Sequence, residues 1–167
     1  MANLTIALAG NPNAGKTTIF NVLTGLHQHT GNWPGKTVEK KEGEVQHGKL
    51  KINIVDLPGT YSLTAYSPEE IIARDFIIQE HPDVVINVVD ATNLERNLYL
   101  TVQILELDVP VVVALNMADD LHKNGAKIDL DQLSQLLGNI PVVSTTANQG
   151  KGISELISKA VRAAGKN

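Results

Sequence analysis

The sequence predicts an α/β fold in which helices cover both faces of a mostly parallel, six-stranded sheet with one antiparallel edge strand. One observation is that five apolar, β-branched runs are spread along the chain, at residues 4–9, 50–57, 83–90, 109–117 and 140–144. Such runs are typical of strands buried on both faces. A second observation is that helical patterns separate most of these runs, and this alternation favours parallel strands joined by right-handed crossovers.

The first two runs flank the one segment that breaks this alternation. Residues 4–9 predict the first strand rather than a signal peptide, because neither a basic flank nor a cleavage site accompanies them. Residues 36–45 alternate in polarity and lead through Gln-His-Gly-Lys into residues 50–57. This pattern predicts a hairpin, and therefore the antiparallel edge strand.

Three further helices are predicted from capping residues and apolar stripes. Ser67, Pro68 and Glu70 form a capping box with proline at the first helical position, and Thr92 repeats the box with Glu95. The buried stripe expected after Thr92 is Leu94, Leu98, Val102 and Leu105. The stripe expected in the last helix is Ile153, Leu156, Ile157, Ala160 and Val161.

The composition excludes several classes of protein. Apolar residues make up 43% of the 167 residues and charged residues 19%, which predicts one globular domain, and no apolar run is long enough to span a membrane. The absence of cysteine excludes disulfides and thiolate metal sites. A formal net charge of −4 provides no basic surface for nucleic acid. We therefore expect a soluble domain with no nucleic-acid partner.

The strongest motif is Gly-Asn-Pro-Asn-Ala-Gly-Lys-Thr at residues 10–17, which fits G-x-x-x-x-G-K-[ST] and lies between a predicted strand and a predicted helix. Backbone N–H groups of such a loop surround phosphate oxygens, and the helix N-terminus adds its dipole. Lys16 would contact the terminal phosphates, and the Thr17 hydroxyl would bind Mg²⁺. This stretch predicts a nucleoside triphosphate site.

Two further motifs suit the same site. Asp-Leu-Pro-Gly, residues 56–59, follows the strand after the hairpin; its carboxylate can reach the magnesium shell and the Gly59 N–H can sense a γ-phosphate. Asn-Met-Ala-Asp, residues 116–119, follows another strand, and Ser-Thr-Thr-Ala-Asn follows the next, at residues 144–148. The Asp119 carboxylate can accept from the two adjacent donors of guanine, whereas adenine would leave it unpaired.

These motifs in this order resemble the translation-factor-type small GTPases, with a Ras-like P-loop fold. Residues 10–25, 31–43, 56–63, 67–76 and 88–103 together resemble the N-terminal G domain of the ferrous-iron transport protein B family. The resemblance covers essentially the whole chain, 1–167. It implies one cytoplasmic domain of a longer protein of the cell (inner) membrane, whose helical spacer and transmembrane permease lie outside this sequence, and which couples GTP binding and hydrolysis to Fe(II) uptake.

The resemblance also implies site residues. Thr37 matches a first-switch threonine that binds Mg²⁺ together with Thr17 and Asp56, and Thr145–Ala147 approach the base. Met117, in place of the frequent lysine, predicts weaker guanine affinity. The nucleotide-binding residues implied are Gly10, Asn11, Pro12, Asn13, Ala14, Gly15, Lys16, Thr17, Thr18, Gly35, Lys36, Thr37, Val38, Glu39, Asp56, Leu57, Pro58, Gly59, Asn116, Met117, Asp119, Thr145, Thr146 and Ala147.

The hydrolytic step lacks the usual water-orienting glutamine, since Thr60 follows Gly59. Arg74 and Arg96 are expected to be solvated helix charges rather than arginine fingers. The resemblance instead implies K⁺ bound by Asn13 and the carbonyls of Gly31 and Trp33, with slow turnover otherwise. The catalytic residues implied are Asn13, Lys16, Thr37 and Gly59.

Several alternatives stay open at this stage. The Trp33 ring either shields a closed first switch or packs on the domain in every state. His27 and His29 are expected to face solvent rather than bind metal. The chain could also be a stand-alone GTPase of tRNA modification or ribosome assembly, or a module that gates a partner by nucleotide occupancy. A homo-oligomer through the switch face is a further candidate assembly.

Overall fold

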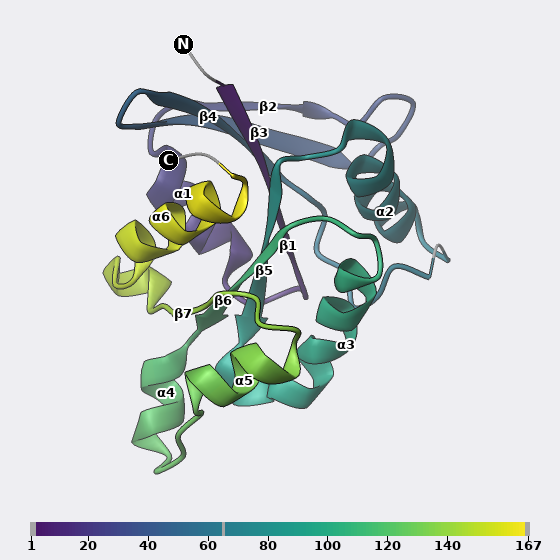
Figure 1. Ribbon diagram of the computed structural model, residues 1–167. Helices are drawn as coiled ribbons and strands as arrows, with labels where there is room; N and C mark the ends of the chain where they lie inside the picture. The colour runs from purple at the N-terminus through teal and green to yellow at the C-terminus, as the bar shows by residue number, and fades with distance from the viewer. Residues whose placement is uncertain (1–2, 65, 166–167) are drawn as a thin grey trace.

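All five apolar runs form strands of one sheet. They are β1 (Asn3–Gly10), β4 (Leu50–Asp56), β5 (Val84–Asp90), β6 (Val111–Asn116) and β7 (Val142–Ser144). The computed structural model describes residues 3–64 and 66–165. The sheet order is β2-β3-β4-β1-β5-β6-β7 (Figure 1). Within it, the neighbours β4 and β1, β1 and β5, β5 and β6, and β6 and β7 pair in parallel. The predicted fold class, a mostly parallel sheet with an antiparallel part, is confirmed.

The sheet has seven strands rather than six. The predicted hairpin is β3 (Glu39–His47) antiparallel to β4, but β3 is not the edge strand, because β2 (Gln28–Asn32) pairs with it in turn. The sequence Gln-His-Thr-Gly-Asn of β2 has no apolar residue, and four of its five residues are exposed. Its strand conformation depends on pairing with β3, so no hydrophobic period marks it.

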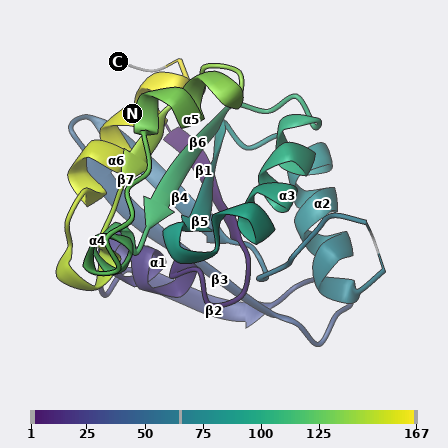
Figure 2. The same cartoon turned by 90° about the horizontal axis from the view of Figure 1, so that it is seen from below.

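Helices cover both faces of the sheet (Figures 1 and 2). Alternate β1 side chains divide between the faces: Leu4, Ile6 and Leu8 join one apolar cluster, and Ala7 and Ala9 join another. The first cluster is closed by α1 (Lys16–Thr24) and α6 (Ile153–Ala163), and the opposite face by α2 (Pro68–Glu80), α3 (Leu94–Leu105) and α5 (Leu130–Leu136). Short helices η1 (Ala91–Asn93), α4 (Ala118–Lys123) and η2 (Ala147–Gln149) follow β5, β6 and β7.

The capping predictions had different outcomes. Ser67 caps α2 as predicted: its hydroxyl accepts from the Glu70 N–H at 3.2 Å. The box at Thr92 is wrong, because Asp90 accepts from the Thr92 N–H at 2.8 Å and α3 begins only at Leu94.

The stripe predicted for α3 is confirmed in part: Leu94, Leu98 and Leu105 are half-buried and pack against the apolar clusters, but they are not the most buried residues of the helix. The buried residues of this helix are Asn97, Leu100, Thr101 and Ile104, while Val102 is exposed. Two polar residues are buried because hydrogen bonds satisfy them: Asn97 accepts from the Asp90 N–H at 3.1 Å, and Thr101 donates to Asn87 at 2.5 Å. The stripe predicted for α6 is confirmed, since all five of its residues are buried. In the described part of the chain, no helix combines the length and apolarity that a bilayer span requires.

Candidate functional site

The turn between β1 and α1 has a backbone that only certain residues tolerate. Asn13 and Gly15 have φ values of 70° and 97°, in the left-handed region. A Cβ on Gly15 would lie 2.0 Å from the Asn116 Nδ2, so this position requires glycine. A reversal of this kind directs successive N–H groups inward, and α1 begins immediately after it at Lys16. The local structure therefore forms an anion-binding loop at a helix N-terminus.

Two of the cavities at this loop share lining residues. The larger, of about 520 Å³, is lined by Asn11, Pro12, Asn13, Gly15, Lys16, Thr17, Thr18, Gly59 and Met117. We call it the phosphate cavity. The smaller, of about 180 Å³, is lined by Gly15, Thr18, Asn116, Met117, Asp119, Asp120, Thr146, Ala147 and Asn148. We call it the base cavity. Because Gly15, Thr18 and Met117 line both, the two cavities are neighbours.

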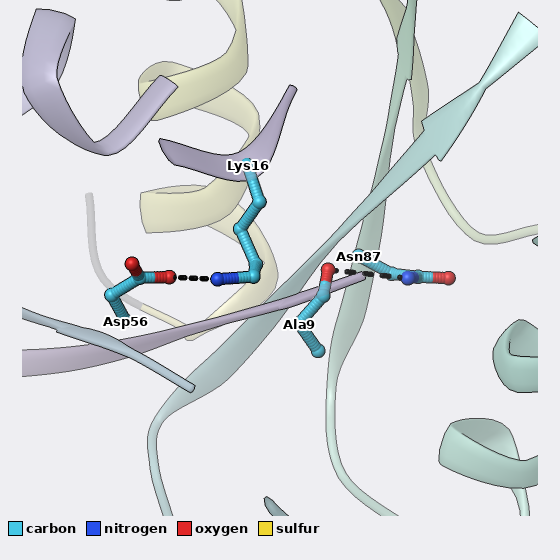
Figure 3. A network of polar contacts seen from close by, with 4 residues as sticks. All are labelled: Ala9, Lys16, Asp56 and Asn87. Carbon is cyan, nitrogen blue, oxygen red and sulfur yellow. Dashed lines mark hydrogen bonds and ion pairs between the residues drawn. The ribbon is translucent and has the colours of Figure 1, made fainter. Parts of the chain in front are cut away.

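An ion pair lies at the wall of the phosphate cavity. The Lys16 ammonium, at the start of α1, donates to the Asp56 carboxylate at the end of β4, and both side chains are more than nine-tenths buried (Figure 3). Each buried charge requires such a partner, because an isolated one would lose its hydration without compensation. The fold thereby holds the Lys16 ammonium and the Asp56 carboxylate, a hard oxygen donor, side by side at the site.

A second buried contact, which the sequence analysis did not predict, lies at the end of β1 and supports the loop that follows it. Asn87 of β5 donates to the Ala9 carbonyl at 3.3 Å, as Figure 3 shows, and accepts from the Thr101 hydroxyl of α3 at 2.5 Å. These bonds join α3, β5 and the end of β1 directly before the phosphate-binding loop. The signal was present in the sequence: Asn87 is the one polar residue inside the apolar run 84–89.

Asn116 ties the phosphate-binding loop to the base cavity. Its amide donates to the Ala14 carbonyl at 3.0 Å, and its oxygen accepts from the Thr145 hydroxyl at 3.0 Å and the Ala147 N–H at 3.1 Å. Asn116 is thus a positioning residue whose polar atoms are satisfied by protein. Asp119 and Asp120, in the first turn of α4, both line the base cavity; Asp119 is half-buried and Asp120 is exposed, so two carboxylates are available to a ligand there.

The segment after Asp56 is held by side chains of α2 and α3. Gly59 lines the phosphate cavity, and the buried Thr60 donates its N–H to the Gly10 carbonyl at 3.1 Å. Farther on, Gln103 accepts from the Leu63 N–H at 2.6 Å. Arg96 was expected to be simply solvated; its guanidinium, although exposed, lies 4.4 Å from the centre of the Tyr61 ring. Arg74 is paired with Asp75 at 3.3 Å.

Glu70 of α2 organises the same segment. Its carboxylate accepts from the Thr64 hydroxyl at 2.6 Å, the Thr64 N–H at 3.1 Å and the Ser62 hydroxyl at 3.0 Å. These hydrogen bonds, that of the Thr64 hydroxyl foremost, favour the charged form and lower the pKa of Glu70 below its ordinary value.

The residues of the first switch, 31–39, do not line the phosphate cavity in this structure. Gly31 lies in β2 opposite Lys40, and Thr37 is exposed and lines neither cavity. Gly35, Lys36, Val38 and Glu39 also line neither cavity. Trp33 is only 7% exposed, packs against Phe76 of α2, and uses its carbonyl to accept from the Lys36 N–H at 2.9 Å. Asn13 therefore lies apart from the other two residues expected to bind K⁺.

The histidines do not form a metal site within residues 3–64 and 66–165. His27 and His29 are exposed, as expected. No cluster of three or more histidine, cysteine, aspartate or glutamate side chains suited to a metal ion occurs in these residues.

Comparison with known proteins agrees with this geometry. The sequence profile of ferrous iron transport protein B matches residues 4–160. The Fe(2+) transporter FeoB of Salmonella typhimurium is 54% identical over 160 residues, which cover 93% of this chain and 21% of the relative. The chain thus spans about a fifth of the length of the curated relatives it matches.

Solved structures extend the comparison to the fold. The FeoB G-domain of Methanococcus jannaschii is 49% identical, with a TM-score of 0.88 over 99% of this chain and 100% of that one. A mutant of S. thermophilus NFeoB, bound to GDP, is 52% identical, with a TM-score of 0.90 over 96% of this chain and 62% of that one. This chain therefore belongs to the ferrous iron transport protein B family and corresponds to the N-terminal G domain of that family.

Proposed function

We propose that this chain binds and hydrolyses GTP as the switch domain of a ferrous-iron transporter. The observation that carries the proposal is that the phosphate and base cavities are neighbours and share Gly15, Thr18 and Met117. A triphosphate on the loop of residues 10–18 would extend its base toward Asp119. The S. thermophilus relative was solved bound to GDP, which supports a guanine nucleotide as the ligand.

Each part of the site has a proposed role. The loop N–H groups and Lys16 hold the phosphates, and Lys16 does so by exchanging Asp56 for a phosphate oxygen. Asp119 accepts from guanine, Met117 covers the base, and Thr145, Thr146 and Ala147 approach its oxygen. Asn116 keeps the two loops in register through its three hydrogen bonds.

The donor set fits Mg²⁺. The Thr17 hydroxyl lines the phosphate cavity and the Asp56 carboxylate lies beside Lys16, and oxygen donors of this kind are what Mg²⁺ prefers. When bound, the metal would neutralise charge on the phosphate oxygens. Thr37 would join these residues once the first switch leaves its present position, and the Gly59 N–H, already at the cavity, would sense the γ-phosphate.

Stimulation by K⁺ is the finer part of the proposal. Asn13 lines the phosphate cavity in a left-handed conformation, which supports it as one ligand. The carbonyls of Gly31 and Trp33 would complete the set only after the first switch rearranges, because Lys36 now donates to the Trp33 carbonyl. A cation there would stabilise transition-state charge at the place of an arginine finger, with slow turnover in its absence.

The names of the relatives suggest the kind of longer protein to which this domain belongs. We propose that this chain is one cytoplasmic domain of a longer membrane protein, joined to a helical spacer and a transmembrane permease, and that its nucleotide state controls Fe(II) uptake. No nucleic-acid partner is proposed. A homo-oligomer through the switch face, formed by residues 31–39 and 56–64, is part of the same proposal.

Turnover in potassium and sodium buffers tests the proposed reaction. Wild-type protein with Mg²⁺ is expected to hydrolyse GTP faster in KCl than in NaCl at equal ionic strength, and to leave ATP largely unchanged. Asn13→Ala is expected to bind GTP while losing the potassium effect. Equal stimulation of mutant and wild type would contradict the role of Asn13, and equal hydrolysis of ATP would contradict the function itself.

A further inference from the structure

Trp33 is buried although the segment that carries it is exposed. Of residues 31–37, only Trp33 is buried; its side chain enters the apolar cluster between the sheet and α2. The edge of one ring meets the face of the other in its contact with Phe76, with centroids 5.7 Å apart and planes at 76°. The Lys40 ammonium lies 4.7 Å from the centre of the indole ring. The Phe76 contact joins the first switch to α2, and the Lys40 contact joins the same ring to β3.

Thr37 and Trp33 belong to one closed turn. The Trp33 N–H donates to the Val38 carbonyl at 3.0 Å, and the Lys36 N–H donates to the Trp33 carbonyl at 2.9 Å. A groove of about 480 Å³, lined in part by Trp33, Lys36 and Phe76, runs beside the turn. Backbone hydrogen bonds thus close the turn itself, while the Trp33 ring supplies its contact with α2.

One feature of the packed arrangement is energetically unfavourable. The indole Nε1–H of Trp33 is buried and has no hydrogen-bond acceptor. A buried donor without a partner loses its bond to water, which raises the free energy of the packed arrangement. Burial of the ring favours the contact and the unpaired N–H opposes it. The free-energy difference between the packed turn and a turn whose ring has left α2 is therefore smaller than ring burial alone would make it.

We propose that Trp33 and Phe76 are positioning residues that decide whether Thr37 reaches the nucleotide. While Trp33 packs on Phe76, Thr37 stays outside the phosphate cavity; when the ring leaves α2, Thr37 and the Trp33 carbonyl can approach the γ-phosphate. The inference rests on the proposed GTPase function. In this proposal α2 contacts both switches, because Glu70 of the same helix accepts hydrogen bonds from Ser62 and Thr64 in the second switch, residues 56–64.

The test compares affinities for GDP and for a non-hydrolysable GTP analogue in Phe76→Ala. Aromatic pairs of this geometry are worth a free energy equivalent to roughly two- to tenfold in an equilibrium constant. Removing the contact is therefore expected to raise analogue affinity relative to GDP affinity by that factor. Phe76→Tyr keeps the ring contact and should restore the wild-type ratio. Ile78→Ala, an exposed position on the same helix outside the groove, is the matched control and should leave the ratio unchanged.

Fluorescence gives a readout that does not depend on turnover. Trp33 is the only tryptophan, so emission reports this contact alone. In wild type the analogue is expected to shift emission to longer wavelength and GDP to leave it blue-shifted; in Phe76→Ala the emission should be red-shifted with either nucleotide. An affinity ratio in Phe76→Ala within twofold of a wild type that binds both nucleotides would overturn this inference alone.

Trp33→Leu provides an independent test whatever the stability of Phe76→Ala. Leucine keeps an apolar side chain at this position but removes the contact between the two rings, so the analogue-to-GDP affinity ratio should rise as it does in Phe76→Ala. A fall in this ratio would contradict the inference. A wild-type protein that binds neither guanine nucleotide would instead contradict the proposed function.

Discussion

Asp119 is the side chain on which base selectivity depends in the proposed site. Its carboxylate lines the base cavity, and the neighbouring Asn116 cannot replace it, because both ends of that amide are already bonded to protein. Guanine presents two adjacent donors to one carboxylate, whereas xanthine presents a carbonyl in place of the amine. An amide at position 119 should therefore prefer xanthine.

The substitution Asp119→Asn tests this assignment. GDP affinity is expected to fall on the order of a hundredfold, since two charge-assisted hydrogen bonds are lost, while xanthosine diphosphate should bind better than in wild type. Competition titration with both diphosphates measures the change. Asp131→Asn, also an aspartate in the first turn of a short helix, is the control. Unaltered guanine preference in Asp119→Asn would place the base elsewhere.

Glu70 makes a prediction about pH. Its pKa lies below the ordinary 4.5 because the Thr64 and Ser62 hydrogen bonds favour the carboxylate. A depressed pKa contributes stability above the unfolded-state value, and this contribution is lost as pH falls through the folded-state value. Glu70→Gln should therefore lower the melting temperature at pH 7, and the difference from wild type should shrink below about pH 4.5. Thermal unfolding across this range measures it; a constant difference would show that charge is irrelevant.

The start of α2 illustrates how a local pattern determines an element. Ser67 supplies the cap and Glu70 bonds back to it at 3.2 Å, with Pro68 at the first helical position. Ser67→Ala is expected to cost about 1 kcal/mol in the free energy of unfolding, because the Glu70 N–H loses its acceptor. Urea unfolding measures this cost. Ser158→Ala, at an exposed position inside α6, should be neutral or slightly stabilising, since alanine favours helix. Equal losses in both would contradict a capping role.

Elements that depend on local sequence were predictable, and those that depend on distant partners were not. The α6 stripe and the Ser67 cap follow from residues within one or two turns. The burial of Asn97 and Thr101 in α3 depends on Asp90 and Asn87, which no periodicity within the helix reveals. β2 was missed for a similar reason: its backbone pairs with β3, while its side chains have no apolar face.

In the functional site too, features that depend on local sequence were predictable and those that depend on distant contacts were not. The loops around Lys16, Asp56, Asn116 and Thr145 each follow an apolar run, and parallel strands bring their ends to one edge of the sheet, so the sequence predicted that they meet. The placement of the first switch could not be predicted in this way. Trp33 packs on Phe76, 43 positions later in the chain, and the resulting position of Thr37 is a tertiary property.

The arrangement of loops and helices suggests how nucleotide could control the domain. The phosphate cavity contacts the second switch at Gly59, Glu70 links that switch to α2, and Phe76 links α2 to Trp33. A change at the γ-phosphate would therefore affect one helix from both switches, which is the type of two-state element on which such switching relies.

Calorimetric titration of the wild-type chain with GDP and with ADP, both with Mg²⁺, tests the central claim most directly. If the neighbouring cavities form a guanine-nucleotide site, GDP should bind with one-to-one stoichiometry and ADP at least on the order of a hundredfold more weakly, because adenine would leave Asp119 unpaired. Equal affinities for the two nucleotides, or no detectable binding of GDP, would contradict the account.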